Sequence, residues 1–475
     1  MIPTPFALVV LLGGFFAKGG TALTLALVLC LFGAAAAVSL PALGGATVTP
    51  AVVFLPFLVW RAFCERTPGA SLRSVSPASF WIVLLASWGF LSALLLPRLF
   101  AGHMQILTVD RSGGNIAATL LPLGPVSGNI TQSGYALGGA LTFVAVRRLL
   151  SREGRLVQFG DAGLWLVGLN CFAAIWNLAE FYAGLPSVLA WVRTANYAIF
   201  DAYEEAGLMR VQGTFSETSA FAAFTLPLFA FSFRLWLAEV RSKLSGSLAL
   251  LSLLLLLIST STTAYAALTL YLGACAAWAL GHVYLYGKLP RAQALAGWII
   301  AGGLTLACVS LIWPHVFLRV FEFAELTVLS KMQSSSGVER NSWNQQAWSN
   351  FLDTFGVGVG LGSARASGFA LVLLSNVGIF GTLMFLAFLK AVWGSQTSAP
   401  NLSASERGVC LAARQAVFAA LAAALVSGAV FDLGMAFYIF AAAASVRTRA
   451  TSELAWAPST SSSNARWQRA AASQL

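Results

Sequence analysis

The stretch GFALVLLSNVGIFGTLMFLAFL, residues 368 to 389, contains no charged side chain from one end to the other. A helix needs about 20 consecutive apolar residues to cross the hydrocarbon core of a bilayer, and this stretch is long enough to do so. The rest of the chain has the same character, because 58% of its 475 residues are hydrophobic and only 9% are charged. So little polar surface predicts a polytopic membrane protein.

Apolar runs lie on both sides of this stretch and predict further membrane-spanning helices. We expect an all-α fold with about 12 or 13 transmembrane helices and long extracytoplasmic loops. The longer runs lie near 20 to 40, 79 to 97, 130 to 147, 160 to 182, 218 to 233, 264 to 283, 294 to 313 and 408 to 428, and the shorter ones near 4 to 17, 46 to 60, 246 to 259 and 433 to 446.

The basic residues are distributed unevenly between alternate loops. Since cytoplasmic loops carry an excess of lysine and arginine, the more basic set predicts the cytoplasmic face, which includes residues 147 to 159 and the C-terminus. The net charge of +11 is then a signal of topology. A nucleic-acid partner is not expected, because no basic face interleaved with aromatic residues is present.

The domain organisation follows from the same pattern. Residues 1 to 449 are expected to form one transmembrane domain. Three long extracytoplasmic loops, near 98 to 129, 183 to 217 and 314 to 367, are expected to carry function, as long loops usually do. Residues 450 to 475 are rich in Ser and Ala and lack an apolar stripe, which predicts a disordered cytoplasmic tail.

Two polar segments interrupt the apolar chain: RVQGTFSETSAFA at 210 to 222 and GVGVGLGSARAS at 356 to 367. Each places an arginine, Arg210 or Arg365, next to an apolar run. Because an arginine at the membrane edge is costly, its presence indicates a function and an anionic partner. The alternating glycines let the backbone approach a ligand or a helix closely. The alternative is that the second segment is a flexible re-entry into the membrane.

Nucleotide and metal sites are not predicted. GVGVGLGS has neither the GxGxxG spacing nor a following GK[ST]. The chain has no DxD pair, its three histidines are far apart, and its six cysteines show no CxxC spacing, so we expect no metal and no cofactor. Glu204 and Glu205 form the closest acidic pair, and neighbouring acids at a membrane edge are more often solvated.

The segment RVQGTFSETSAFA, followed by an apolar helix, resembles the R-x-x-G-x-F segment of the O-antigen polymerase and ligase superfamily. FSE with a following Ser is typical of its exopolysaccharide polymerases. The pieces LLLLLISTSTTAYAAL, GVERNSWNQQAW, GVGVGLGSARAS with LLSNVGIFG, GGATVTP and PRLFAG are also similar to that family and occur in order along most of the chain.

The resemblance implies a metal-independent membrane glycosyltransferase with a GT-C-like architecture, acting at the outer face of a bacterial inner membrane. Its donor and acceptor would be glycans linked to undecaprenyl diphosphate in the lipid bilayer. The enzyme would polymerise repeat units into exopolysaccharide or O-antigen with inversion at the anomeric carbon, and a chain-length regulator and a flippase would be among its partners. A ligase would instead transfer the glycan to lipid A core.

Departure of a lipid diphosphate develops negative charge, which arginines can neutralise with a planar fork of donors. We therefore assign catalytic roles to Arg210, Arg340 and Arg365. Glu217 is the candidate base, and its alternative role is to cap a helix N-terminus. The residues expected to contact substrate are Gly213, Ser216, Ser219, Asn341, Trp343, Gly360, Gly362, Ser363 and Ser367.

Ligases of this superfamily carry a histidine cluster in the segment that resembles GSARASGF, whereas this chain has Arg365 and Ser367 there. The departure favours polymerase over ligase and leaves the identity of the base open, with His315 and Asp432 as further candidates. A lipid-linked oligosaccharide flippase is the alternative from another class. It would place charges at the membrane midplane and large loops on both faces.

Overall fold

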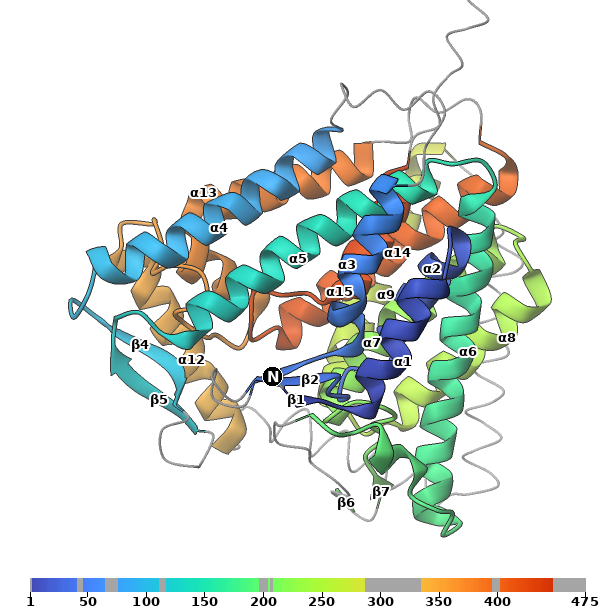
Figure 1. Ribbon diagram of the computed structural model, residues 1–475, viewed down its shortest axis with the longest axis horizontal. Helices are drawn as coiled ribbons and strands as arrows, with labels where there is room; N and C mark the ends of the chain where they lie inside the picture. Colours follow the sequence, from blue (N-terminus) through green and yellow to red (C-terminus); the bar gives the residue numbers. More distant parts are fainter. Residues whose placement is uncertain are drawn as a thin grey trace, which may run out of the picture.

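The computed structural model describes residues 2–40, 46–64, 76–110, 117–195, 204–205, 208–286, 335–394 and 402–446, and these are mostly helical (Figure 1). The helices are α1 (Pro5–Phe16), α2 (Gly20–Leu29), α3 (Pro50–Cys64), α4 (Pro77–Leu99), α5 (Ser127–Leu150), α6 (Arg155–Tyr182), η2 (Val188–Trp191), α7 (Thr218–Leu237), α8 (Ser242–Ile258), α9 (Thr262–Tyr286), α12 (Ser335–Asp353), α13 (Phe369–Trp393), α14 (Ala404–Ser427) and α15 (Met435–Ala444). The strands are β1 (Ile2–Pro3), β2 (Val38–Leu40), β3 (Ala46–Val48), β4 (Gln105–Asp110), β5 (Ala117–Pro122), β6 (Glu204–Glu205) and β7 (Leu208–Met209).

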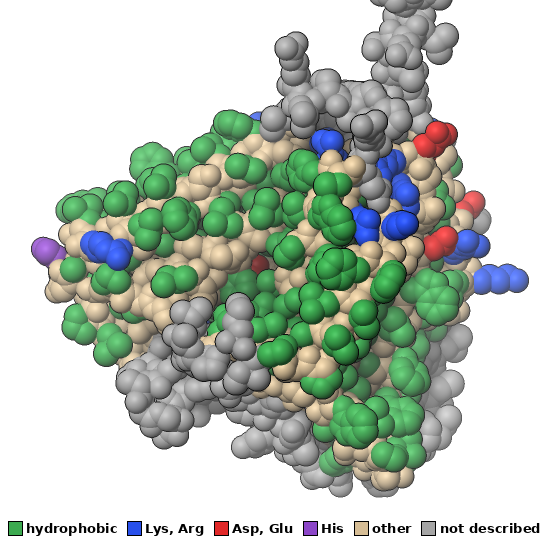
Figure 2. Space-filling view, in the orientation of Figure 1, with side chains coloured by type: hydrophobic (Ala, Val, Ile, Leu, Met, Phe, Trp, Pro, Cys, Tyr) green, Lys and Arg blue, Asp and Glu red, His purple; other side chains and the backbone are tan. Residues whose placement is uncertain are grey.

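Among the described residues, five helices are long and apolar enough to cross a membrane: α4, α6, α7, α13 and α14. Their outer faces carry large apolar side chains such as Phe80, Leu95, Trp165 and Phe172, each more than half exposed. Figure 2 shows hydrophobic side chains spread widely over the visible face. A surface with so many exposed apolar side chains suits contact with lipid. The helix hydropathy is that of a multi-pass membrane protein.

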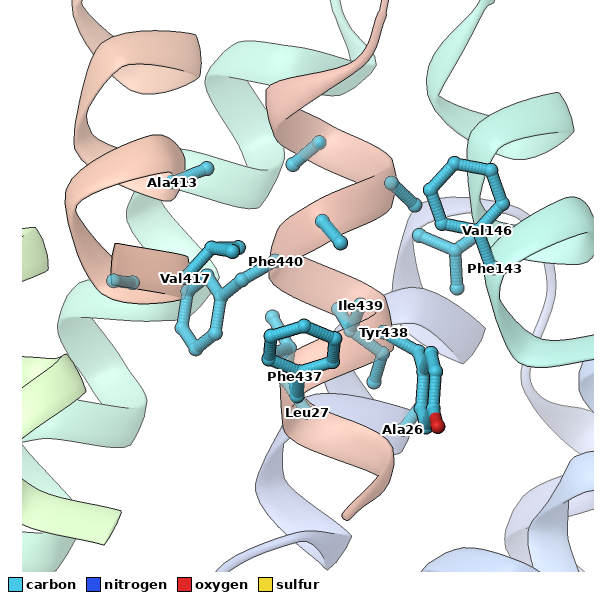
Figure 3. Packing of buried hydrophobic residues seen from close by; sticks show 14 of the residues in the cluster. Ala26, Leu27, Phe143, Val146, Ala413, Val417, Phe437, Tyr438, Ile439 and Phe440 are labelled. Carbon is cyan, nitrogen blue, oxygen red and sulfur yellow. The ribbon is translucent and has the colours of Figure 1, made fainter. Parts of the chain in front are cut away.

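The short helix α15 lies inside the bundle rather than against lipid. Residues 441 to 444 are alanines with no exposed surface, and Phe440 packs on Phe159 of α6 and Phe231 of α7 at ring distances of 5.8 and 5.2 Å. Figure 3 shows α15 surrounded by side chains of α2, α5 and α14. A helix that is apolar on all sides is one that is buried on all sides. The predicted span at 433 to 446 is therefore a core helix of ten residues.

The all-α prediction is wrong in one respect, because the connectors contain short antiparallel strands. β1, β2 and β3 form one small sheet, β4 and β5 form a hairpin, and β6 pairs with β7. The hairpin lies in the connector after α4, which the sequence predicts as a loop. The backbone N–H and C=O groups of connectors need hydrogen-bond partners, and pairing of short strands supplies those partners. Such pairing does not need the long apolar run by which a membrane helix is recognised in the sequence.

The span predicted at 20 to 40 is also wrong, because α2 ends at Leu29. Residues 34 to 37 are buried alanines that pack under other connectors: Ala34 N–H donates to Thr214 O at 3.3 Å, and Ala36 N–H to Thr194 Oγ1 at 3.1 Å. The apolar run therefore reflects burial in protein rather than in lipid. A pattern of hydropathy cannot distinguish the two.

Part of the loop predicted at 314 to 367 is a helix, α12, which packs against α13 and β4. The remaining predicted spans coincide with helices to within a few residues, apart from 294 to 313. That span, residues 314 to 334, His315 and the C-terminal tail lie outside the described residues.

The polar segments at 210 to 217 and 356 to 367 lie at the same end of the bundle. Arg241, which follows α7, bonds Asp161 at the start of α6 at 3.0 Å, whereas Gly213, which precedes α7, bonds Asn177 near the end of α6. α5 reverses into α6 through residues 151 to 154, so the start of α5 and the end of α6 lie together. Asn129 at that start bonds Ser363. We name this the loop end, and the opposite one, with the 151 to 154 turn, the basic end.

Candidate functional site

The glycine loop, residues 356 to 367, is hydrogen-bonded to a break in α13. Gly378 has φ 65° and ψ −165°, which interrupts the helix. The interruption frees the carbonyls of Ser375 and Asn376, and these accept from the N–H groups of Val359 at 2.8 Å and Gly360 at 3.0 Å. Backbone groups inside a membrane protein need such internal partners. The loop and the broken helix complete each other.

The alternating glycines are required by this packing. Gly356, Gly358, Gly360 and Gly362 all have positive φ, which side chains disfavour. A Cβ on Gly358 would lie 2.8 Å from the carbonyl of Asn376, one on Gly360 would lie 2.8 Å from that of Ser92, and one on Gly362 would collide with that of Gly128. The loop thus approaches α13, α4 and α5 at backbone distance. It is not a flexible re-entry.

Two buried asparagines hold the glycine loop in place. The Oδ1 atom of Asn376 accepts from Gly362 N–H at 3.0 Å and Ala364 N–H at 3.3 Å, while its Nδ2 donates to Ala364 O at 2.9 Å. Asn129 on α5 donates from Nδ2 to Leu361 O and to Ser363 Oγ, both at 2.8 Å. Both asparagines are almost fully buried, so these hydrogen bonds fix the loop firmly.

The end of the glycine loop carries Arg365 and Ser367. Arg365 is half-buried, and its backbone N–H donates to the backbone carbonyl of Leu107 in β4 at 3.0 Å. Ser367 N–H donates to Asn344 Oδ1 of α12 at 2.8 Å. The backbone on either side of the Arg365 side chain is therefore held by two different elements. The backbone that carries Arg365 is therefore ordered, and a guanidinium is a side chain suited to binding an anion.

The Arg210 segment, residues 210 to 217, is fixed in a similar way at the start of α7. Asn177 Oδ1 of α6 accepts from Gln212 N–H at 3.0 Å and Gly213 N–H at 3.1 Å. The guanidinium of Arg193 donates to Gly213 O from Nε at 3.0 Å. Gly213 has φ 57°, and Arg210 and Ser216 are half-buried. A second arginine is thus mounted on a loop that a buried asparagine orders.

Glu217 occupies the N-cap position of α7, but its carboxylate does not cap the helix backbone. It is exposed and accepts a short hydrogen bond from Ser219 Oγ. The carboxylate is still favoured there, because the N-terminal end of a helix carries partial positive charge. Glu217 therefore contacts solvent, where its carboxylate is accessible to a hydroxyl group of an acceptor glycan.

The other predicted residues lie on α12, where Arg340 and Asn341 are exposed and Trp343 is half-buried. The glycine loop is bonded to α4, where Ser92 Oγ accepts from Leu361 N–H at 3.3 Å, and by the hydrogen bonds named above to α5, α12, α13 and β4. The Arg210 segment is bonded to α6 and to the turn after α2. The two groups share no element. Figure 1 shows α12, α13 and β4 on one side of the view and α6 with β7 on the other. The predicted site therefore consists of two parts across the loop end.

Asp432 lies in the connector between α14 and α15, also at the loop end. It is half-buried, and its Oδ1 accepts from Gly434 N–H at 3.1 Å. Burial raises the pKa of Asp432 to about 6, against the opposing effect of this hydrogen bond. A carboxyl group with a pKa near the working pH suits proton transfer. Asp432 is thus a stronger candidate base than the sequence indicates.

Asn129, Asn177 and Asn376 are absent from the residues that the sequence singles out. The available signal is their position, because each amide lies in or beside an apolar helix where a polar side chain is expensive. In the described part of the chain, no group of three or more His, Cys, Asp and Glu residues is placed to hold a metal ion. No protein-family model, no curated protein and no solved structure matches this chain.

Proposed function

We propose that this protein is a membrane glycosyltransferase that joins lipid-diphosphate-linked oligosaccharide repeat units into a polysaccharide. The observation that carries the proposal is the placement of two arginines, Arg210 and Arg365, on rigid polar loops at one end of an apolar helix bundle. Such loops offer fixed positive charge to an anionic lipid head group at the membrane edge. The family resemblance of both segments names the lipid as undecaprenyl diphosphate.

In the proposed reaction, a hydroxyl oxygen of the acceptor glycan forms a bond to the anomeric carbon of the donor. The bond between that carbon and the diphosphate oxygen breaks. Glu217 or Asp432 takes the hydroxyl proton, and the arginines neutralise the charge on the departing lipid diphosphate. Departure of the diphosphate drives the transfer, so the reaction needs no nucleotide.

Purified protein in lipid nanodiscs, supplied with lipid-linked repeat units, tests the proposal directly. We expect glycans of two or more repeats that are still attached to lipid diphosphate. In a second reaction that also contains lipid A core, transfer only to that acceptor would assign the ligase function. In proteoliposomes, movement of the lipid-linked glycan across the bilayer without a new glycosidic bond would assign the flippase function instead.

We expect the reaction to survive chelation. If arginine rather than a divalent cation neutralises the leaving diphosphate, EDTA should lower the initial rate by less than about twofold. The measurement is product formation by purified protein before and after treatment. A large loss that Mg²⁺ or Mn²⁺ restores would show that a metal ion takes part, and Glu204 and Glu205 would be examined first.

The proposal places the loop end outside the cytoplasm. At the basic end, Arg148 donates to Ala62 O, Arg155 packs against Gly19, and Arg241 pairs with Asp161. Figure 2 shows most of the visible Lys and Arg side chains gathered there, near α2, α3 and the start of α6. This distribution supports a cytoplasmic basic end.

Cysteine labelling tests this orientation. Cys64 is exposed at the basic end, and Ser349 is exposed on α12 at the loop end. In a background without the other cysteines, we expect an impermeant maleimide to label Cys64 only after the membrane is permeabilised. Ser349→Cys should react in intact spheroplasts. The reverse pattern would invert the topology and contradict the proposed reaction face.

A further inference from the structure

A groove with a volume of about 340 Å³ lies between α12 and the β4–β5 hairpin. One wall consists of Ser342, Gln345, Gln346 and Ser349, which follow helical spacing and so occupy one face of α12. The other wall is the cross-strand pair Leu107 and Leu120. The volume is at the lower end of the range for small-ligand sites.

The lining of the groove is uncharged and has two kinds of surface. Amide and hydroxyl groups on α12 both donate and accept hydrogen bonds, while the two leucines are apolar. Gln345, Ser342, Ser349 and Leu120 are exposed, so a ligand can reach them. A sugar ring has a matching pair of surfaces, with hydroxyl groups around its edge and C–H groups on its face. The absence of charge among the six lining residues favours neutral sugars over acidic ones.

The polar wall is held against the hairpin by Gln346. Its Nε2 donates to Gln105 O of β4 at 2.8 Å and to Asn350 Oδ1 at 3.0 Å. Ser342 and Ser349 donate their own hydrogens to Glu339 O and Asp353 Oδ2, and their oxygens can still accept from a ligand. A wall that is already ordered loses less entropy on binding.

Both walls also hold the backbone around Arg365. The carbonyl of Leu107, whose residue lines the groove, accepts from Arg365 N–H at 3.0 Å, and α12 binds Ser367 through Asn344. The backbone of Arg365, the arginine that the proposed reaction places on the lipid diphosphate, is therefore bonded to a residue that lines the groove.

We infer that this groove binds the neutral saccharide part of a lipid-linked glycan, so that the glycan is aligned next to Arg365. The inference rests on the proposed function for the identity of its ligand. The Trp348 and Phe351 rings, 5.4 Å apart, are not among the residues that line the groove, so the sugar contacts are amides, hydroxyls and leucines rather than aromatic rings.

Blocking the groove tests the inference. The probe is the neutral oligosaccharide fraction released by mild acid from the lipid-linked glycans of the producing strain, titrated into full-length protein in nanodiscs. Gln345→Trp and Ser349→Trp fill the groove and should weaken binding at least tenfold. Leu352→Trp is the matched control, because Leu352 is an exposed residue of the same helix outside the groove, and its affinity should stay within twofold of wild type.

Unchanged binding by both blocked variants, no binding by the wild type, or tighter binding of an oligogalacturonate of equal length would overturn the inference. The transfer assay separates it from the proposed function. If the blocked variants bind the probe and polymerise normally, the groove assignment fails and the enzyme assignment stands. If blocking abolishes binding but the wild type transfers no sugar, the groove assignment stands and the proposed function fails.

Discussion

Arg210→Ala is expected to lower the polymerisation rate on the order of 10²-fold, by analogy with removal of one preorganised donor from a charged transition state. Fold and membrane insertion should be retained. Arg210→Lys should fall between the two, because lysine keeps the charge but loses the planar fork that binds two phosphate oxygens. The measurement is glycan length and initial rate at matched protein concentrations.

Arg241→Ala is the control for Arg210. Arg241 is an exposed arginine of the basic end, and its ion pair with Asp161 is screened by solvent, so its removal should leave the rate unchanged. Near-normal polymer from well-folded Arg210→Ala protein would exclude Arg210 from catalysis. If the arginine serves instead to pair with Glu204, Glu205 or Glu217, alanine should mainly lower the melting temperature, and a further Glu→Gln change at that partner should restore function.

Asn376→Ala is expected to give the largest loss of stability. The change leaves the N–H groups of Gly362 and Ala364 without their acceptor, and each buried orphan costs about 1–3 kcal/mol. We expect a melting temperature lower by on the order of 10 °C in detergent. Asn376→Asp keeps the acceptor but loses the hydrogen bonds from Nδ2, so it should also destabilise the protein.

Asn341→Ala is the matched control for the stability measurement, since Asn341 is exposed on α12 and its truncation should change stability by less than about 0.5 kcal/mol. If Asn376→Ala and Asn341→Ala had the same melting temperature, the hydrogen bonds of the glycine loop would not stabilise the fold. A variant that keeps its stability but loses activity would instead point to a direct role of Asn376 in the reaction.

Hydropathy predicts the long helices well, because a run such as residues 218 to 237 has to avoid water over its whole length. It fails where an apolar run is short or is covered by protein. Residues 30 to 37 are apolar because they lie under other connectors, and α15 is apolar because it is central. α12 escapes detection for the opposite reason. It is polar on most sides and buries only a few side chains, among them Ala347 and Asn350, so it carries no apolar stripe.

The candidate site could be predicted in part. Glycine at alternate positions and arginine beside an apolar run identify the two loops, since both features are costly without a reason. The alternation of loops between the two faces of the membrane also predicts that both loops lie at the same end of the bundle. The asparagines that hold them, and the break in α13 at Gly378, depend on contacts between residues far apart in the chain. Local sequence does not contain that information.

The break at Gly378 has a consequence for the order in which the helices are inserted into the membrane during synthesis. Next to the break, the carbonyl of Val377 accepts from the indole nitrogen of Trp88 at 2.9 Å. Trp88 belongs to α4, which is synthesised long before α13. A carbonyl in the hydrocarbon core without a hydrogen-bond donor is costly in free energy, so α13 alone in lipid is destabilised at this break. Because α4 is synthesised first and supplies the Trp88 donor, we expect α13 to insert stably into the membrane only where it can pack against α4.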